Sequence, residues 1–134
     1  NMTATFLGCS NFKGQGLGMW DVSSMTSALC MFRHCEQLCE DLSAWNTSSL
    51  QEMGIMFEGC EVFNAPIGTW DTSSVVCMEC ALMFCPSFRQ DISRWDTSKV
   101  TEIGYVLPPR VHEHAPPHAR ANLPGCFPPL TLAL

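Results

Sequence analysis

Nine cysteines give the sequence its clearest potential for chemistry, because thiolates bind zinc and also pair as disulfides. The pair in Cys77-Met-Glu-Cys80 has the spacing of half a zinc knuckle, but no second Cys-x-x-Cys or Cys-x-x-His follows at a suitable distance. The nearest further ligands, Cys30 and Cys85, come from other parts of the chain. We therefore predict no metal site and keep a Cys-rich metal-binding module as the weaker hypothesis.

Catalytic groups are sparse. His34 is the only histidine before residue 112, and no serine or cysteine can be paired with it by spacing alone. The Gly-x-Gly-x-Gly motif that starts at Gly14 precedes a predicted strand, whereas a phosphate-binding loop follows one. A Pro-rich C-terminal segment holds three more histidines, which such tracts usually leave solvated: His112, His114 and His118. The sequence predicts a protein that is not an enzyme and needs no cofactor or metal.

Acidic or amide side chains follow each of the four tryptophans by one position. They are Asp21, Asn46, Asp71 and Asp96. A row of single carboxylates with one amide supplies too few oxygens for Ca²⁺, which takes six to eight, so we favour a role in turns at the surface. The residues just before the tryptophans form a chemically mixed set, as partner contacts often do: Met19, Ala44, Thr69 and Arg94. These eight residues are the predicted partner-binding face.

The tryptophans define a repeat. Trp20, Trp45, Trp70 and Trp95 are evenly spaced, and they stand in the phrases GMWDVSSM, SAWNTSSL, GTWDTSSV and SRWDTSKV. The stretch before the first tryptophan fits as a partial unit if one extra residue is allowed between Phe12 and Leu17. A period of this length, about 25 residues, indicates stacked units, in which each unit covers the apolar faces of its neighbours.

One column of the repeat is cysteine. Cys9, Cys35, Cys60 and Cys85 occupy it, next to a column of large apolar residues. Free cysteine is among the most buried residue types, so we predict that these side chains pack inside the stack. Stacked chains about 4.8 Å apart would be close enough for disulfides, but equivalent side chains point in parallel and not toward each other.

The elements of each unit are predicted from the spacing of its apolar residues. Inward residues two apart, such as Trp95 and Thr97, indicate a short strand. The next apolar residues, Val75, Met78 and Leu82 in the preceding unit, have the spacing of a short helix. We therefore expect an α/β fold: a right-handed, leucine-rich-repeat-like solenoid of about four 25-residue coils, each with one short parallel strand and one short helix.

The repeat resembles a known family. A unit reads Trp-Asp-Thr-Ser-x-Val, then Met, Met-Phe, Cys, Phe-Asn and Ile before the next Trp. Over residues 2 to 107 this pattern is similar to that of the BspA-like leucine-rich-repeat surface proteins. The resemblance implies a leucine-rich-repeat-like solenoid on an exported or lipid-anchored protein, with adhesion or protein recognition as its role and no catalytic activity. It also implies an extracellular or cell-surface location.

The charge narrows the class of partner. Residues 1–107 carry 12 acidic and five basic side chains, for a formal charge of −7 within a total of −6. An acidic surface disfavours nucleic acid and anionic membranes, and no apolar run reaches the roughly 20 residues of a membrane span. We expect a solenoid at 1–107 and a poorly ordered Pro- and His-containing tail at 108–134. Because the first residue is Asn1, we also expect the chain to be a piece of a longer protein.

These features together predict a non-catalytic cell-surface recognition or adhesion module that binds a protein or glycan through the strand face. A structural spacer within a larger surface protein is the alternative.

Overall fold

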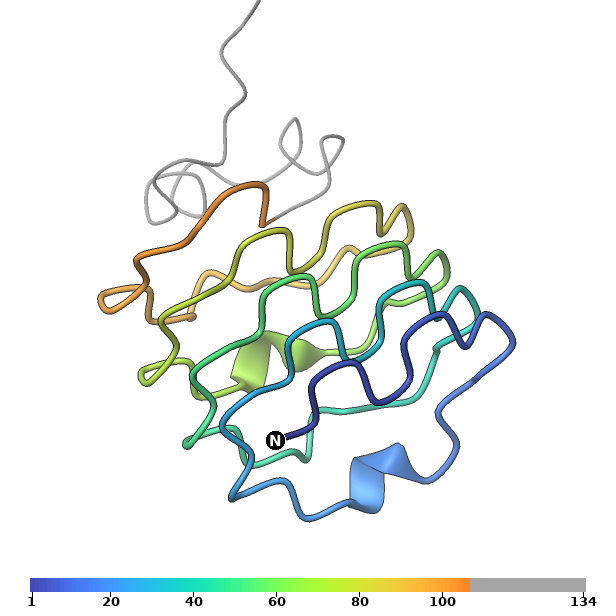
Figure 1. Ribbon diagram of the computed structural model, residues 1–134, viewed down its shortest axis with the longest axis horizontal. Coiled ribbons are helices and arrows are strands. Elements are labelled where there is room, and N and C mark those ends of the chain that lie inside the picture. Colours follow the sequence, from blue (N-terminus) through green and yellow to red (C-terminus); the bar gives the residue numbers. More distant parts are fainter. Residues whose placement is uncertain (107–134) are drawn as a thin grey trace, which may run out of the picture.

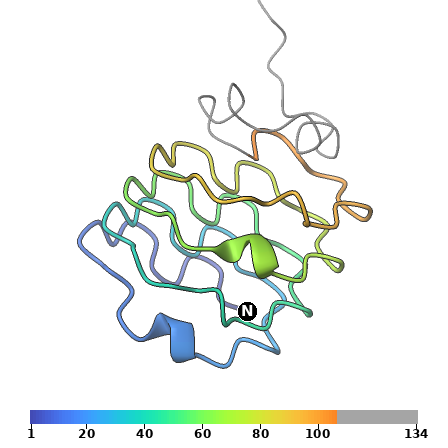
Figure 2. The ribbon, with the colours of Figure 1, turned by 180° about the vertical axis from the view of Figure 1, so that it is seen from behind.

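The computed structural model describes residues 1–106, which wind into coils, one for each unit of the repeat, that stack along one axis (Figure 1). The two short 3-10 helices in this range are η1 (Leu17–Met19) and η2 (Ile67–Thr69). Residues 1–106 contain no strand, and their β-type contacts are isolated parallel bridges that join Ser27 to Glu52, Glu52 to Cys77 and Cys77 to Glu102. The view from behind shows the chain segments on the opposite side of each coil, which also lie side by side (Figure 2). The predicted α/β solenoid, with a strand and a helix in every coil, is therefore wrong.

Turns replace the predicted helix. In residues 28–35, the N–H groups of Met31, Arg33 and Cys35 donate to carbonyls three residues earlier, at 2.9–3.2 Å. The intervening N–H groups cross to the next coil, so that Cys30 donates to Gly54 at 3.0 Å. Residues 2–9 and 53–60 repeat this alternation, and residues 78–85 share the crossing bonds. We call these four stretches the turn segments, and they are the wavy traces in Figure 1.

Left-handed backbone explains why the turn segments do not become helices. The third and seventh residues of each segment have positive φ: Ala4 and Gly8, Cys30 and His34, Ile55 and Gly59, Cys80 and Phe84. A residue with positive φ is compatible with a turn but interrupts an α-helix. The inward residues of a turn segment, such as Ala28, Met31, Phe32 and Cys35, are nevertheless spaced i, i+3, i+4 and i+7. That spacing is also the signature of a helix face, and this coincidence misled the prediction.

Side chains replace the predicted strand ladder. The backbone at Trp20 and Trp70 is extended, but around the tryptophans the hydrogen bonds between coils come from side chains. The indole Nε1 of Trp70 donates to the carbonyl of Leu42 in the preceding coil at 2.9 Å, and Trp45 donates to Leu17 at 2.7 Å. In the other direction, the hydroxyl of Thr47 donates to the carbonyl of Asp71 at 3.0 Å.

The interior of the stack consists of the predicted apolar columns. Trp45, Trp70 and Trp95 are each 4% exposed, and the rings of Trp45 and Trp70 stack 5.8 Å apart at 8°. A parallel column of phenylalanines includes Phe32 and Phe57, whose ring centroids are 5.6 Å apart. The extra residue in the first unit is also confirmed, because Cys35 bonds to a carbonyl 29 residues earlier whereas the later cysteines bond 28 residues earlier.

Alternate coils differ, so the structure repeats fully only at every second coil. Before Trp20 and Trp70 the chain forms η1 and η2, whereas Asp41 and Asp91 begin turns there in the other two coils. A side chain at Gly18 or Gly68 would collide with the carbonyl oxygen of Asp41 or Asp91. Glycine is therefore required in every second coil, where the backbone of the next coil approaches closely.

The hydrogen bonds of the buried indoles predict that substitutions of Trp70 and Trp20 lower the stability of the fold by different amounts. We expect Trp70→Phe to lower the free energy of unfolding by about 1–2 kcal/mol, because it leaves a space and removes the bond to Leu42. Trp20→Phe is the matched control and should cost less than about 0.5 kcal/mol, since that ring is 42% exposed. Urea unfolding measures both. Equal losses would contradict the stacking of the indoles.

The left-handed backbone at Phe84 predicts that glycine and alanine substitutions there reverse their usual order of stability. Phe84 has a φ of 56° and is 55% exposed, so its side chain contributes little burial. We expect Phe84→Gly to be more stable than Phe84→Ala by up to about 1 kcal/mol, because only glycine adopts this φ without strain. At the exposed Arg94, which is not among the positive-φ residues, the alanine variant should be the more stable one. Thermal unfolding of the four variants tests the reversal.

Candidate partner-binding ridge

The predicted partner-binding face is exposed throughout. All eight of its residues lie at the surface: Met19, Asp21, Ala44, Asn46, Thr69, Asp71, Arg94 and Asp96. Each pair flanks a tryptophan, and because the backbone is extended at Trp20 and Trp70, neighbours of the inward ring point outward. We call these residues the ridge. The coils thus bring together side chains from four successive units of the repeat.

Local turns fix half of the ridge. The Oδ1 atom of Asp71 accepts a hydrogen bond from the N–H of Ser73 at 3.0 Å, and Asp21 accepts from Ser23 at the same distance. Asn46 makes the equivalent bond with Ser48, and so does Asp96 with Ser98. These are Asx turns, in which the side chain bonds to the backbone two residues on. The repeated Asp-x-Ser phrase therefore positions the carboxylates as well as turning the chain.

The same bonds keep the ridge charged. Hydrogen bonds from the side chain and backbone of Ser73 lower the pKa of Asp71 below its ordinary value of 3.8, against a weaker opposing effect from the charge of Asp96. Serine bonds also lower the pKa of Asp21 and of Asp96. At neutral pH the ridge therefore carries three carboxylate charges, with Asn46 between the first and second and Arg94 between the second and third.

No metal centre is formed by the described part of the chain. Within residues 1–106, no three His, Cys, Asp or Glu side chains gather closely enough to hold an ion. Burial raises the pKa of both Cys77 and Cys80, so these thiols are protonated at neutral pH. His112, His114, His118 and Cys126 lie outside the described residues, as does the whole segment 108–134.

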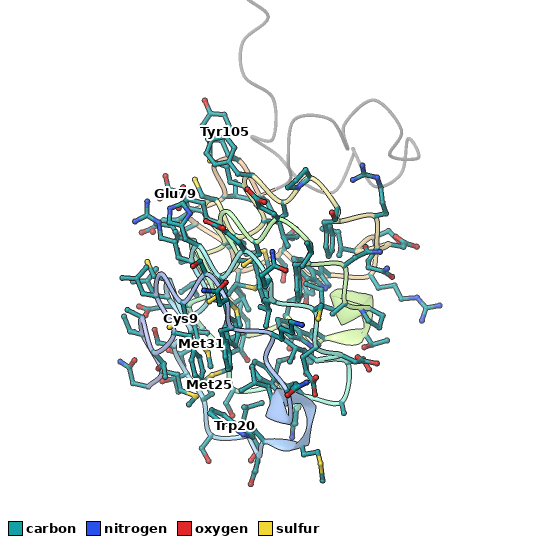
Figure 3. All side chains as sticks on the ribbon, turned by 90° about the vertical axis from the view of Figure 1, so that its right-hand side faces the viewer. Cys9, Trp20, Met25, Met31, Glu79 and Tyr105 are labelled. Carbon is teal, nitrogen blue, oxygen red and sulfur yellow. The ribbon has the colours of Figure 1, made fainter. Side chains whose placement is uncertain are left out.

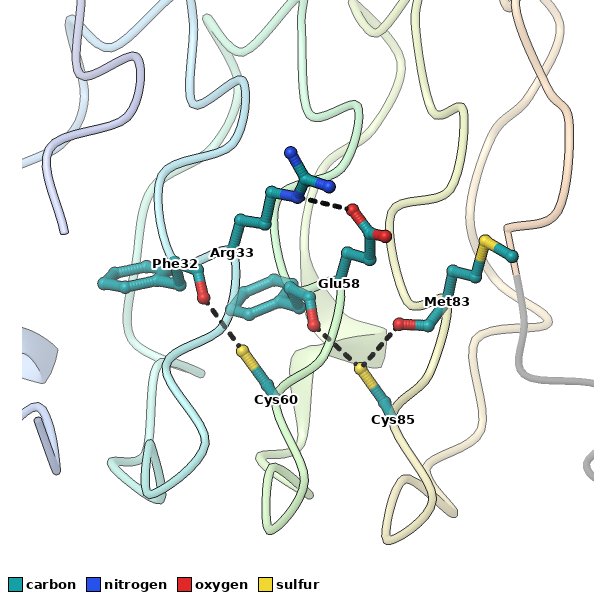
Figure 4. Close-up of polar contacts among 7 residues, drawn as sticks. Phe32, Arg33, Glu58, Cys60, Met83 and Cys85 are labelled. Carbon is teal, nitrogen blue, oxygen red and sulfur yellow. Dashed lines mark hydrogen bonds and ion pairs between the residues drawn. The ribbon is translucent and has the colours of Figure 1, made fainter. Parts of the chain in front are cut away.

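The cysteine column serves as a second set of links between coils. The thiol of Cys60 donates to the carbonyl of Phe32 at 3.1 Å, and that of Cys85 donates to Phe57 at 2.9 Å (Figure 4). Burial raises the pKa of Cys35 to about 11 and that of Cys85 to about 12. Protonated thiols are hydrogen-bond donors and poor nucleophiles, so these cysteines hold the coils together and are not reactive. Cys9, the first member of the column, is exposed, so the prediction that it packs inside the stack is wrong. All cysteines among residues 1–106 are free.

A pair of surface charges also joins neighbouring turn segments. The Nε atom of Arg33 lies 2.8 Å from a carboxylate oxygen of Glu58 (Figure 4). Both side chains are at least partly exposed, and such a pair contributes little to stability.

One exposed feature was missed by reasoning from the sequence. Trp20 is 42% exposed although it occupies the interior column of the repeat, and Met19 beside it is 92% exposed. The signal was available, because Trp20 belongs to the first of the described coils, and no described coil lies on its outer side (Figure 3). The apolar surface at this end adjoins the ridge.

Comparison with known proteins places the chain in a family. The model of DUF285, described as "Mycoplasma protein of unknown function", matches residues 1–110. The chain belongs to the DUF285 family. The DUF285 match includes every described coil and assigns no activity to them. No curated protein and no solved structure shows significant similarity to the chain. The described residues also include no helix with the length and apolar character that crossing a bilayer requires.

The Asx turns predict a dependence of stability on pH. A carboxyl whose pKa is lowered by folding stabilises the fold above its unfolded pKa, and this contribution is lost as pH falls through the folded pKa. We expect Asp71→Asn to keep the turn, as Asn46 does, and to weaken the loss of stability between pH 5 and pH 2. Asp71→Ala should be less stable than Asp71→Asn at pH 7. Melting temperatures across this range test both expectations, and superimposable wild-type and Asn profiles would contradict the first.

Proposed function

We propose that residues 1–106 form a non-catalytic recognition or adhesion module, which binds a protein or glycan partner through the ridge at a cell surface. The observation that carries the proposal is the fixed orientation of exposed side chains by Asx turns in four successive coils. A surface that is ordered before binding loses less conformational entropy on binding, which favours affinity. The cell-surface location rests on the resemblance to BspA-like proteins.

The composition of the ridge suits this role. The Asx-turn residue after the tryptophan is an aspartate or asparagine in every coil, but the residue before the tryptophan changes from Met19 to Ala44, Thr69 and Arg94. The ridge thus offers an apolar end, a polar middle and a charged end along one line. Mixed surfaces of this kind are typical of protein recognition. Its acidic character favours partners that carry positive charge or hydrogen-bond donors, and disfavours nucleic acid.

A structural spacer is the alternative function. It is supported by the continuous packing of the coils, since each interior coil is bonded to its neighbours through both the turn segments and the tryptophans. A spacer would need no specific ridge residues. The described residues offer no support for a metal-binding module.

Substitution of the ridge separates the two functions. The test variant is Thr69→Ala, Asp71→Asn and Arg94→Ala together, in which asparagine preserves the turn. If the ridge binds, coated beads carrying this variant should attach to cell monolayers, matrix proteins or arrayed glycans at least about tenfold more weakly than wild type, the loss expected when about 1.4 kcal/mol of contact is removed. Solid-phase binding with matched protein loading provides the measurement.

The matched control changes the same number of exposed residues away from the ridge. Glu36→Gln, Glu61→Gln and Arg89→Ala together remove three exposed charges that lie outside the ridge. This variant should bind like wild type. If both triple variants bind equally well, or if wild type binds no surface in the panel, the spacer is the better interpretation.

A further inference from the structure

The ridge contains one side chain that can accept a glycan. Asn46, Thr47 and Ser48 form an Asn-x-Ser tripeptide without proline, which is the acceptor sequence for N-linked glycosylation. Asn46 and Ser48 are exposed, whereas Thr47 is buried and its hydroxyl donates to the carbonyl of Asp71 in the next coil at 3.0 Å. The middle residue thus anchors the tripeptide, and the two residues that glycosylation uses lie at the surface.

The turn engages only one half of the Asn46 amide. Its Oδ1 atom accepts hydrogen bonds from the Ser48 hydroxyl at 2.8 Å and from the Ser48 N–H at 3.2 Å. Its Nδ2 atom donates to no residue within the described range 1–106. Asn1 accepts the same pair of bonds from Thr3, at 2.7 and 2.9 Å, in a second Asn-x-Ser/Thr tripeptide. The hydroxyl-to-amide bond is therefore a shared property of both tripeptides.

This geometry is compatible with glycosyl transfer to Nδ2. The reaction forms a bond between Nδ2 and the anomeric carbon of a glycan, and it breaks the bond from that carbon to the diphosphate of a lipid-linked donor. Nδ2 loses one proton and the diphosphate leaves. Because Oδ1 remains an acceptor in the product, the Asx turn survives the modification. The glycan leaves from an exposed position, as a bulky surface modification requires.

The other coils show that the turn does not need an amide. Asp21, Asp71 and Asp96 occupy the equivalent position and make the equivalent turn with a carboxylate oxygen. A carboxylate has no N–H group to exchange for a glycan, so these three residues cannot be acceptors. The amide nitrogen of Asn46 is thus a group that the turn itself does not use.

We propose that Asn46 is an acceptor site for N-linked glycosylation from a lipid-linked glycan donor during export of the chain. The proposal rests on the cell-surface location given under the proposed function, but it does not require that the ridge has a partner. A glycan on Asn46 would stand between the coils of Met19 and Thr69, and would cover the middle of the ridge.

Secretion of the full chain from a eukaryotic cell line, behind a cleavable signal peptide, tests the proposal. Mass spectrometry with peptide mapping should find a glycan on Asn46. Peptide-N-glycosidase should remove this glycan and convert the amide to a carboxylate. Ser48→Ala should abolish the modification, because it removes the hydroxyl that the acceptor sequence requires, whereas Ser48→Thr should keep it.

Moving the acceptor to the next coil gives the decisive result. Asp71→Asn creates the same Asn-Thr-Ser tripeptide in the same turn, and Asn46→Asp removes the original acceptor while keeping a residue type that makes the turn elsewhere. The double variant should carry a glycan at position 71 and none at position 46. A secreted wild type without a glycan on Asn46, a Ser48→Ala variant modified as fully as wild type, or a double variant unmodified at position 71 would overturn the proposal. Since the readout needs no partner, its outcome is separate from that of the ridge-binding test.

Discussion

The structure depends on backbone carbonyls that accept two hydrogen bonds each, one from their own coil and one from the next. The Leu42 carbonyl accepts the N–H of Trp45 and the indole of Trp70, and the Phe32 carbonyl accepts the N–H of Cys35 and the thiol of Cys60. A carbonyl oxygen has two lone pairs, so both bonds are compatible. Because the second donor always lies in the following coil, no coil can satisfy this pattern alone, and order in one coil requires its neighbours.

This interior explains how the surface can vary. The tryptophan, the cysteine and their acceptors repeat with little change, whereas the outward positions beside the tryptophan include Met19 at one end and Arg94 at the other. The Asx turns depend only on a carboxylate or amide followed by a serine N–H two residues on, so they tolerate Asn46 among aspartates. The ridge therefore combines a nearly constant row of Asx-turn residues with a row of variable side chains before the tryptophans, and repeat proteins recognise partners through such variable surface positions.

The sequence predicted what faces inward but not the backbone that carries it. The even spacing of the tryptophans was enough to assign the tryptophan, phenylalanine and cysteine columns that are buried in the later coils, since residues that recur as apolar in every unit must face the interior. It wrongly placed Cys9 and Trp20 of the first coil inside as well. The i, i+3, i+4 and i+7 spacing of the inward residues could not distinguish a helix from successive turns. Positive φ at residues such as Ile55 and Cys80 has no sequence signature. The alternation between successive coils is readable in the sequence, because Gly18 and Gly68 alternate with serines at the same position, two residues before each tryptophan.

The positive φ at Ile55 shows how the stack offsets local strain. A left-handed conformation costs a β-branched residue about 1–2 kcal/mol, and nothing within a single turn compensates for it. In this conformation the N–H of Ile55 reaches the carbonyl of Glu79 at 2.7 Å, and that of Cys80 reaches Gly104 at the same distance. These bonds exist only when the next coil is in place. The strain therefore opposes the folding of isolated coils and makes the stack, with its ridge, form as one cooperative unit.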